Sequence, residues 1–201
     1  MTRLVEIWRD GGPRAIALKI LEQTVYRRML LIEYPLDQPA ATPPPASAGT
    51  AIGQLTANEI DDYLAFRPDA EAADVRDRLE RGEICFVARH DGRIVSAAWA
   101  VSGSAWIGYL GTTMPVEPHE AYLYDSFTLP AFRGQSLPVV RAAYHTRYFR
   151  GAGYRRLLAV VVPENRRGVR HAEKVGWKVF GVMGYVKVGP WRRDFRRLRP
   201  R

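Results

Sequence analysis

Hydrophobic positions along the chain follow two periods, one typical of helices and one typical of strands. Apolar residues three or four positions apart predict helices in several segments. The predicted helices cover residues 13–23, a segment that begins at Thr56, and residues 70–81, 138–150 and 165–175. Runs rich in β-branched and aromatic residues predict strands. The predicted strands cover residues 25–36, 84–89, 93–101, 106–110, 120–129 and 157–162.

Turn and capping residues fix several of these boundaries. Thr56 precedes Glu59 by three positions, which is the spacing of a capping box at a helix start. The Asp91-Gly92 pair between two strand-like runs predicts an antiparallel hairpin. The strand, helix, strand order over residues 120–162 implies a parallel, right-handed crossover. The pattern therefore predicts an α/β fold.

A proline-rich stretch over residues 39–49 interrupts the pattern. It contains three consecutive prolines, Pro43 to Pro45, and too little apolar surface to pack, so we expect a loop or linker. We divide the chain into residues 1–50, with a helix, a strand and this loop, a main domain over residues 51–190, and a basic tail over residues 191–201. The first part is too small to fold alone.

The composition is that of a globular protein, with 47% hydrophobic and 25% charged residues. Cys85 is the only cysteine, so neither an internal disulfide nor a cysteine-rich zinc site can form, and no metal is expected. The aliphatic runs are too short to span a bilayer, and charged residues interrupt the N-terminal segment where a secretory signal would be apolar. We expect a cytoplasmic protein.

The formal net charge is +9, and much of the excess lies near the C-terminus. The simplest interpretation of this basic segment is a solvated, partly disordered tail. Weak contact with RNA or an anionic membrane is an alternative, as is a homodimer interface formed with the N-terminal strand. The basic residues at this end are Lys187, Arg192, Arg193, Arg196, Arg197, Arg199 and Arg201.

The segment over residues 127–138 joins a predicted strand to a predicted helix. A loop that enters a helix presents unpaired N–H groups and the positive end of the helix dipole, which together bind anions. Gly134 permits close approach of the backbone to a ligand, and Arg133 adds a permanent charge. Taken alone, the segment could equally be an ordinary strand-to-helix turn.

Two motifs, one within this segment and one further along the chain, make the phosphate interpretation more specific. Residues 129–134, Leu-Pro-Ala-Phe-Arg-Gly, resemble the V/L-x-P-x-x-R-G core of the pyrophosphate-binding motif of GNAT acyltransferases. Residues 165–177 resemble the second signature of that family, in which an asparagine precedes a helix with Glu-Lys, then a glycine and an aromatic residue. The strand predicted over residues 157–162 lies between the two motifs, where the fifth strand of the family belongs.

The resemblance implies a GNAT fold, with a mixed, mostly antiparallel sheet, splayed parallel fourth and fifth strands, and helices on both faces. It implies transfer of an acetyl or other short acyl group from acyl-CoA to an amine, by direct attack on the thioester. The acceptor, a small molecule or a protein amine, is not readable from the sequence. The implied CoA-binding residues are Phe127, Thr128, Leu129, Arg133, Gly134, Gln135, Ser136, Leu137 and Asn165.

Three positions depart from the family pattern. Ser136 stands where a second glycine is usual, and Pro138, which has no N–H group, replaces a third small residue. The Ser136 hydroxyl could supply the missing phosphate contact. Ala172 occupies the position of the tyrosine that often protonates the departing thiolate. Because a thiolate is a good leaving group, this acid is dispensable. A non-catalytic module that binds acyl-CoA remains an alternative function.

The catalytic base is expected on the strand over residues 120–128. Asp125 is our first candidate, because burial among aromatic side chains can raise the pKa of a carboxylate toward neutrality. Tyr124 is the second candidate. His145 and His171 are further candidates, because the ordinary pKa of a histidine side chain suits a base near pH 7. Both lie on predicted helices, where a lone histidine is more often structural or exposed.

Overall fold

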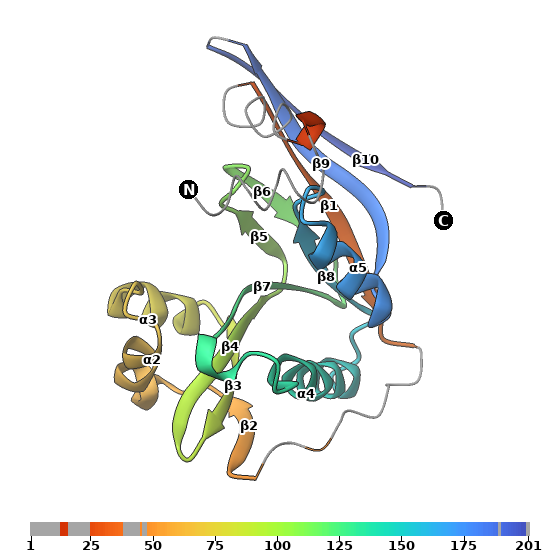
Figure 1. Ribbon diagram of the computed structural model, residues 1–201. Helices are drawn as coiled ribbons and strands as arrows, with labels where there is room; N and C mark the ends of the chain where they lie inside the picture. The colour runs from red at the N-terminus through yellow and green to blue at the C-terminus, as the bar shows by residue number, and fades with distance from the viewer. Residues whose placement is uncertain (1–12, 16–24, 38–44, 46–47, 189, 200–201) are drawn as a thin grey trace. The chain divides into compact units, whose positions relative to one another are not determined.

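The computed structural model describes residues 13–15, 25–37, 45, 48–188 and 190–199 (Figure 1). The chain forms two compact units. One comprises Pro35–Ala105 and Met114–Leu157, and the other comprises Met1–Tyr34, Trp106–Thr113 and Leu158–Arg201. Residues 13–15, at the start of the helix predicted over residues 13–23, are helical, whereas the rest of that helix and most of the proline-rich loop lie outside the described residues. The predicted boundaries at residues 50 and 190 stay predictions.

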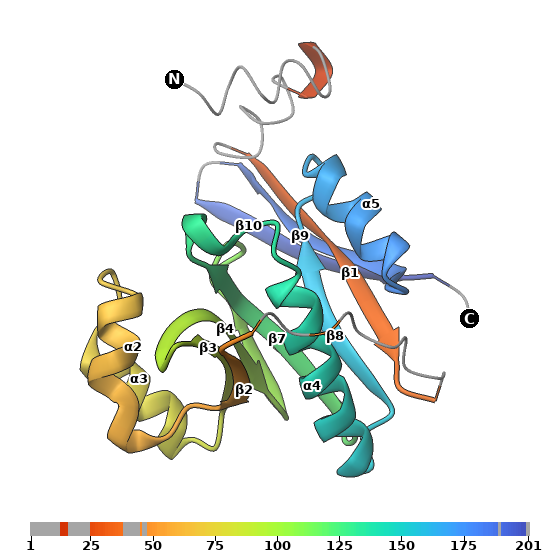
Figure 2. The ribbon, with the colours of Figure 1, turned by 60° about the horizontal axis from the view of Figure 1, so that its bottom comes forward.

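The first unit contains four antiparallel strands in the order β7, β4, β3, β2 (Figure 2). The predicted hairpin is confirmed, because β3 pairs with β4 and Asp91 and Gly92 both take the positive φ that such a turn requires. The sequence pattern missed the edge strand β2. The strands are β2 (Thr50–Gln54), β3 (Ile84–His90), β4 (Arg93–Val101) and β7 (Glu120–Thr128).

Helices cover both faces of this four-stranded sheet. On one face lie α2 (Ile60–Phe66) and α3 (Ala72–Glu80), preceded by the 3-10 turn η1 (Ala57–Glu59), whose predicted capping box with Thr56 is present. On the other face lies α4 (Leu137–Gly151), whose Phe149 packs against Phe86 of β3. Most residues of β3 and β4 are therefore buried.

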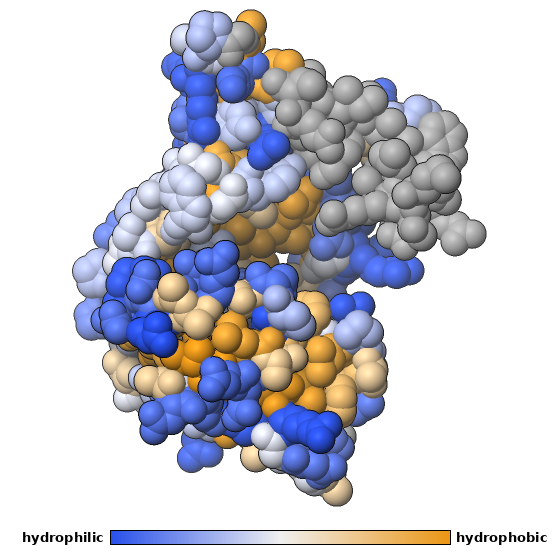
Figure 3. All heavy atoms as spheres, turned by 90° about the vertical axis from the view of Figure 1, so that its left-hand side faces the viewer, coloured by the Kyte–Doolittle hydropathy of each residue, from blue (hydrophilic) through white to orange (hydrophobic). Residues whose placement is uncertain are grey.

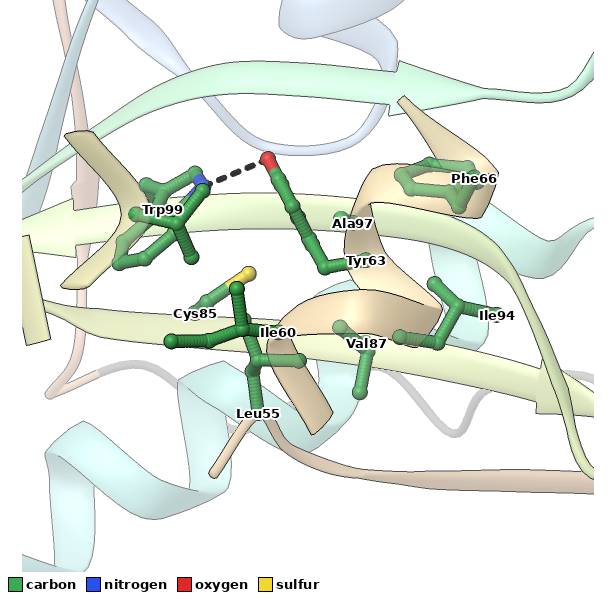
Figure 4. Close-up of a cluster of buried hydrophobic side chains, with 10 residues drawn as sticks. Leu55, Ile60, Tyr63, Phe66, Cys85, Val87, Ile94, Ala97 and Trp99 are labelled. Atoms are coloured by element: carbon green, nitrogen blue, oxygen red, sulfur yellow. Dashed lines mark hydrogen bonds between the residues drawn. The ribbon is translucent and has the colours of Figure 1, made fainter. Parts of the chain in front are cut away.

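The core beneath α2 and α3 is organised around Trp99 (Figure 4). Its indole N–H donates to the hydroxyl of Tyr63 at 2.9 Å, and the two rings meet edge to face. Cys85 lies in the same cluster and is 1% exposed. Burial raises the pKa of its thiol, so this cysteine remains a neutral, packed side chain.

The second unit contains strands in the order β10, β9, β1, β8, with the helix α5. The strands predicted over residues 25–36 and 157–162 are confirmed as β1 and β8. The prediction that the C-terminal segment is an unstructured tail is wrong for residues 191–198, because β10 pairs antiparallel with β9 at eight positions. The elements are β1 (Tyr26–Pro35), β8 (Arg156–Val161), α5 (Arg166–Lys174), β9 (Lys178–Val188) and β10 (Trp191–Leu198).

Two short strands form a separate two-stranded sheet, β5 (Ser104–Ile107) and β6 (Thr112–Pro115). The strand predicted over residues 106–110 therefore begins earlier and ends at Ile107, and a turn follows it. The splay expected between the fourth and fifth strands of the family concerns β7 of one unit and β8 of the other, and stays a prediction. The fold of the described residues is thus mixed α/β with mostly antiparallel strands.

Candidate active site

The loop between β7 and α4 has the conformation of an anion-binding turn. A single 3-10 turn, η2 (Pro130–Phe132), follows β7, and the backbone then takes positive φ at Gly134 (80°) and Ser136 (59°). Ser136 is the N-cap of α4, and its side chain makes no capping hydrogen bond. The first helical residue, Leu137, is 1% exposed and packs with Ala88 and Val95. This buried anchor holds an otherwise exposed loop.

Four successive backbone N–H groups of this loop are available to a ligand. Among the described residues, the structure shows no hydrogen-bond acceptor for the amides of Gly134, Gln135, Ser136 and Leu137. A Cβ atom added at Gly134 would meet no atom within 4 Å, so the space beside this amide is open. Consecutive amides with alternating left-handed residues at a helix N-terminus form a concave anion site. The binding of a pyrophosphate by these amides stays a prediction.

Side chains around the loop leave that concavity accessible. The exposed Arg133 donates from Nε to the carbonyl oxygen of Thr128 at 3.2 Å, which holds its guanidinium near the end of β7. Gln135 donates from its side chain to the carbonyl of Ala131, also at 3.2 Å. Ser136 is exposed, and its own amide is one of the four free N–H groups. These contacts are compatible with the expected roles of Arg133, Gln135 and Ser136.

The last residues of β7 are partly engaged with the sheet. Phe127 and Thr128 pair with Ala97 and Ser96 of β4, and the amide of Leu129 donates to Val95 at 3.0 Å. β7 pairs with β4 along one of its two edges, and the Leu129 amide is used in that pairing. The expected pairing of Phe127 and Thr128 with a pantetheine arm would therefore use other backbone groups.

A β-bulge lies in β7 just before these residues. Between the pairs Ala97–Phe127 and Trp99–Tyr124, β4 contributes one residue and β7 contributes two, Asp125 and Ser126. Asp125 takes a φ of 46°, which is uncommon for a residue other than glycine. Bulges of this kind turn side chains out of the regular alternation and are frequent next to active sites.

Asp125 accepts hydrogen bonds from two arginines, one on each carboxylate oxygen. Arg67, which follows α2, donates to Oδ1 at 3.0 Å, and Arg78 of α3 donates to Oδ2 at 3.0 Å. The carboxylate is 27% exposed, so these ion pairs are partly shielded from water. Arg78 also lies over the rings of Trp99 and Tyr124. The expectation that Asp125 lies mainly among aromatic groups thus missed its two cationic partners.

Tyr124 has an acidic partner that the sequence pattern did not reveal. Its hydroxyl donates a short hydrogen bond to Oε2 of Glu83, the residue before β3. Burial and this hydrogen bond raise the pKa of the Tyr124 hydroxyl, so the tyrosine side chain is neutral. Oε1 of Glu83 accepts from Arg81 at 2.8 Å, which leaves the pair at the edge of the arginine cluster.

Asn165 belongs to the other unit and caps its own helix. Its side-chain oxygen accepts from the amide of Gly168 at 3.0 Å at the start of α5. A Cβ atom at Gly168 would lie 2.5 Å from the Asn165 amide nitrogen, so glycine is needed for this cap. The contact of Asn165 with pantetheine stays a prediction.

The two histidines considered from the sequence differ in burial. His145 of α4 is 5% exposed and packs against Phe86. Burial and the neighbouring Arg141 lower the pKa of His145 to about 3, so it is neutral near pH 7. His171 of α5 is exposed. Within the described part of its own unit, His145 shows no hydrogen bond, ion pair or ring contact with Asp125 or Tyr124.

The described part of the chain has neither a metal-binding cluster nor a membrane-spanning helix. No group of three or more histidine, cysteine, aspartate or glutamate side chains in the described part of the chain is arranged to hold a metal ion. None of the helices within residues 48–188, nor the short segment at 13–15, is long and apolar enough to cross a bilayer.

The outer surface around α2 and α3 is mixed in character (Figure 3). Charged side chains border an apolar region on this face. A depression of about 450 Å³ between the two helices is lined by Ile60 and Leu79 together with Arg76 and Glu80. This depression is separate from the loop at the start of α4.

Comparison with known proteins gives the family. Residues 52–177, more than half of the chain, match the acetyltransferase (GNAT) family. Among curated proteins, none matches the sequence significantly. Solved structures whose sequences are less than 25% identical to this chain have the same fold as this chain. The chain is similar to AAC(6')-Iy, an aminoglycoside N-acetyltransferase solved with a bisubstrate analogue, at 20% identity over 63% of this chain and 89% of that one, with a TM-score of 0.50.

Two further solved structures extend this similarity. A glucosamine N-acetyltransferase region of a fungal multi-domain β-N-acetylglucosaminidase is 14% identical, with a TM-score of 0.58 over 93% of this chain and 23% of that one. A GCN5-related N-acetyltransferase from Kribbella flavida is 19% identical, with a TM-score of 0.50 over 82% of this chain and 60% of that one. The chain belongs to the GNAT acetyltransferase family.

Proposed function

We propose that this protein is an N-acetyltransferase that transfers an acetyl, or another short acyl group, from acyl-CoA to an amine. The observation that carries the proposal is the row of four free amides from Gly134 to Leu137 at the start of α4. Such a row suits a pyrophosphate better than any other group of CoA. The bulged segment of β7 that holds Tyr124, Asp125 and Ser126 comes directly before this loop.

The proposed CoA-binding residues are those that the family resemblance implies, and the free amides of the loop support the first group of them. The amides of Gly134 to Leu137, with the charge of Arg133, bind the pyrophosphate. The Ser136 hydroxyl provides a donor in place of the amide that Pro138 lacks. Backbone groups of Phe127 and Thr128, next to Leu129, pair with the pantetheine arm, and Asn165 contacts its far end.

Amide formation requires a proton to leave the attacking amine. We assign this step to Tyr124 and Glu83. The phenolic oxygen accepts the amine proton while the phenolic hydrogen passes to Glu83, so the tyrosine stays neutral throughout. This relay suits a hydroxyl whose pKa is raised by burial, because a free phenolate is costly there. The amine nitrogen forms a bond to the thioester carbon, and the CoA thiolate leaves.

Asp125 is the competing base. Both of its oxygens already accept from guanidinium groups, so an amine would have to share or displace an arginine. In the proposed mechanism Asp125 instead holds Arg78 over the ring of Tyr124 and Arg67 over the ring of Phe127. Substitution of Glu83, Tyr124 and Asp125 in turn separates the two assignments.

The acceptor remains an amine of unassigned structure. AAC(6')-Iy and a metagenomic enzyme solved with sisomicin are aminoglycoside acetyltransferases, and the fungal neighbour is a glucosamine N-acetyltransferase region. An amine panel should therefore include amino sugars and aminoglycosides beside polyamines and peptide amines. We place the reaction in the cytoplasm because the chain has one cysteine and therefore no internal disulfide, which suits a reducing compartment.

Two measurements on the full chain test the proposal. Acetyl-CoA at a hundredfold excess over its Kd should stabilise the fold by about 2.7 kcal/mol, which is detected as a rise in Tm. Release of free thiol in the presence of an amine then reports turnover. Binding without release of thiol over the whole panel would favour the non-catalytic acyl-CoA module. The absence of any Tm shift with several CoA thioesters would contradict both functions.

A further inference from the structure

A buried arginine lies behind the bulge of β7. Arg141 of α4 is 3% exposed, and no carboxylate within the described part of the chain lies at ion-pair distance from it. Its guanidinium donates instead to neutral oxygens, the hydroxyls of Ser96 and Ser126 and the carbonyl of Phe127. Its Nε atom has no partner among the described residues. Burial lowers its pKa to about 10, so the side chain is charged near pH 7.

This arrangement is unfavourable for stability alone. A buried charge without a counter-ion is costly, and replacement by an apolar side chain of similar volume is often neutral or stabilising. The hydroxyl and carbonyl dipoles that surround Arg141 compensate part of the cost. A role beyond packing would explain why α4 carries a cation at a position that faces the sheet interior.

Ser126 connects this charge to the protein surface. Its Oγ accepts from Nη2 of Arg141 at 2.7 Å, whereas the residue itself is exposed. Among the described residues, the structure shows no acceptor for the Ser126 hydroxyl hydrogen. A hydroxyl that accepts from a cation becomes a stronger donor, because hydrogen bonds in a chain polarise one another. Ser126 therefore presents a polarised donor at the bulge, next to Asp125.

We propose that Ser126 donates this hydrogen bond to the thioester oxygen during acyl transfer, and that Arg141 strengthens the donor from behind. The inference rests on the proposed acyltransferase function. As the amine adds to the thioester carbon, the carbonyl electron pair moves to the oxygen, which becomes the negative acceptor. When the intermediate collapses, the pair returns to the carbonyl, the carbon–sulfur bond breaks and CoA leaves as a thiolate. Ser126 keeps its proton in both steps. Ser126 is then a catalytic residue and Arg141 a positioning residue.

The first test compares Ser126→Ala with Ser126→Thr in the full chain. Removal of one donor to an oxyanion typically lowers kcat by about a hundredfold or more. We expect Ser126→Ala to lower kcat to that extent while the Kd of acetyl-CoA, from thermal shifts, changes less than about twofold. Ser126→Thr keeps the hydroxyl and should retain most of kcat. Unchanged turnover in Ser126→Ala would overturn the inference.

The second test separates charge from structure at Arg141. Arg141→Met should lower kcat by a factor similar to that of Ser126→Ala while Tm stays equal or rises, and Arg141→Lys should restore part of kcat. Because the two residues act as a unit, the double variant should be no slower than the slower single variant. Arg147→Met, at an exposed position of the same helix, is the matched control and should leave kcat and Tm unchanged.

The outcomes distinguish failure of the inference from failure of the proposed function. If wild-type protein releases no thiol with any amine, the acyltransferase function fails first. If wild type turns over and Arg141→Met loses kcat only in parallel with a fall in Tm, Arg141 is structural and the inference fails. If Arg141→Met does not fold, the Ser126→Ala and Ser126→Thr pair still decides whether the hydroxyl takes part.

Discussion

The hydroxyl of Tyr124 on β7 donates a hydrogen bond to the carboxylate of Glu83, which lies 41 positions earlier in the sequence and precedes β3. The contact couples the phenol to a carboxyl group at the edge of a cluster of arginines. Arg78 lies over the Tyr124 ring and donates to Asp125, while Arg81 donates to Glu83. The pair therefore supplies an acceptor for a proton, and the neighbouring arginines hold the pair in place.

Substitution within this pair should slow turnover. We expect Glu83→Gln and Tyr124→Phe each to lower kcat by about a hundredfold, because a general base typically contributes a factor of that order. The measurement is release of thiol from acetyl-CoA at saturating amine. The Kd of acetyl-CoA should hardly change in either variant, because neither side chain belongs to the loop at the start of α4.

Asp125→Asn is the decisive comparison for this assignment. The amide keeps an oxygen for one arginine but cannot accept a proton. A loss of kcat confined to Asp125→Asn, with Glu83→Gln close to wild type, would assign the base to Asp125, as the sequence pattern first indicated. A loss confined to Glu83→Gln and Tyr124→Phe would establish the relay.

Gly134 should be essential for binding acyl-CoA. A β-branched residue at a φ of 80° is strained by about 1–2 kcal/mol or more, and its side chain would occupy the open space beside the free amides. We expect Gly134→Val to abolish the Tm shift produced by acetyl-CoA. Gly153→Val is the matched control, because Gly153 also has a φ of 80°, is also free of neighbours within 4 Å, and lies beyond the other end of α4. A wild-type Kd in Gly134→Val would show that phosphate binds elsewhere.

The parts that the sequence predicted correctly are those encoded by nearby residues. Asp91-Gly92 specifies a hairpin within two positions, and the conformation of the loop at Gly134 depends on the strand and helix that directly flank it. The two edge strands β2 and β10 were missed because the first is short and the second is mostly charged. In β10 the residues on both faces are mostly exposed, so its arginine-rich sequence lacks the alternation of apolar and polar residues that predicts a strand.

The partners in the site could not be predicted for a different reason. Arg67, Arg78 and Glu83 reach the bulge of β7 only because α2 and α3 pack on the sheet and β3 pairs next to β4. On a predicted surface helix, a charged residue such as Arg78 is indistinguishable from a solvated one. The helical pattern also did not predict that Arg141 is a buried charge.

Burial of His145 predicts a specific dependence of stability on pH. The pKa of His145 is about 3 in the folded protein against an ordinary value of 6.5. The unfolded chain therefore binds the extra proton below pH 6.5, and this contribution to stability is lost as the pH falls from about 6.5 toward about 3. The expected slope is about 1.4 kcal/mol per pH unit.

Urea unfolding of wild type and His145→Met at pH 7 and pH 5 isolates this contribution. Wild type should lose about 2 kcal/mol more than the variant between the two values, because only its unfolded state gains the proton. Other groups, including Glu59, whose pKa is lowered by its capping and ion-pair contacts, affect both proteins equally. Parallel pH curves would show that the pKa of His145 is the same in the folded and unfolded states, which would contradict the prediction.

The C-terminal strand provides the last prediction. In β10, Phe195 stacks on Tyr26 of β1 with ring centroids 5.9 Å apart, and Arg192 lies 4.1 Å from the centroid of the Tyr185 ring. The backbone of β10 also passes so close to β9 that a Cβ atom at Gly181 would lie 2.7 Å from the carbonyl oxygen of Arg197. These contacts indicate that the segment is integrated with its unit.

A chain that ends at residue 189 should therefore be less stable than the full chain, with a lower Tm and a tendency to aggregate through the exposed edge of β9. Arg193→Gln combined with Arg197→Gln is the matched control, because both side chains are exposed and the strand remains. This double variant should keep its stability within about 0.5 kcal/mol of wild type. Any salt-sensitive binding to RNA or anionic vesicles should weaken in it, because such binding arises from screened or counterion-releasing charge contacts. If instead the truncated chain melts at the wild-type temperature and keeps full turnover, β10 contributes nothing to the fold, and the interpretation of this segment as a solvated appendage would be correct.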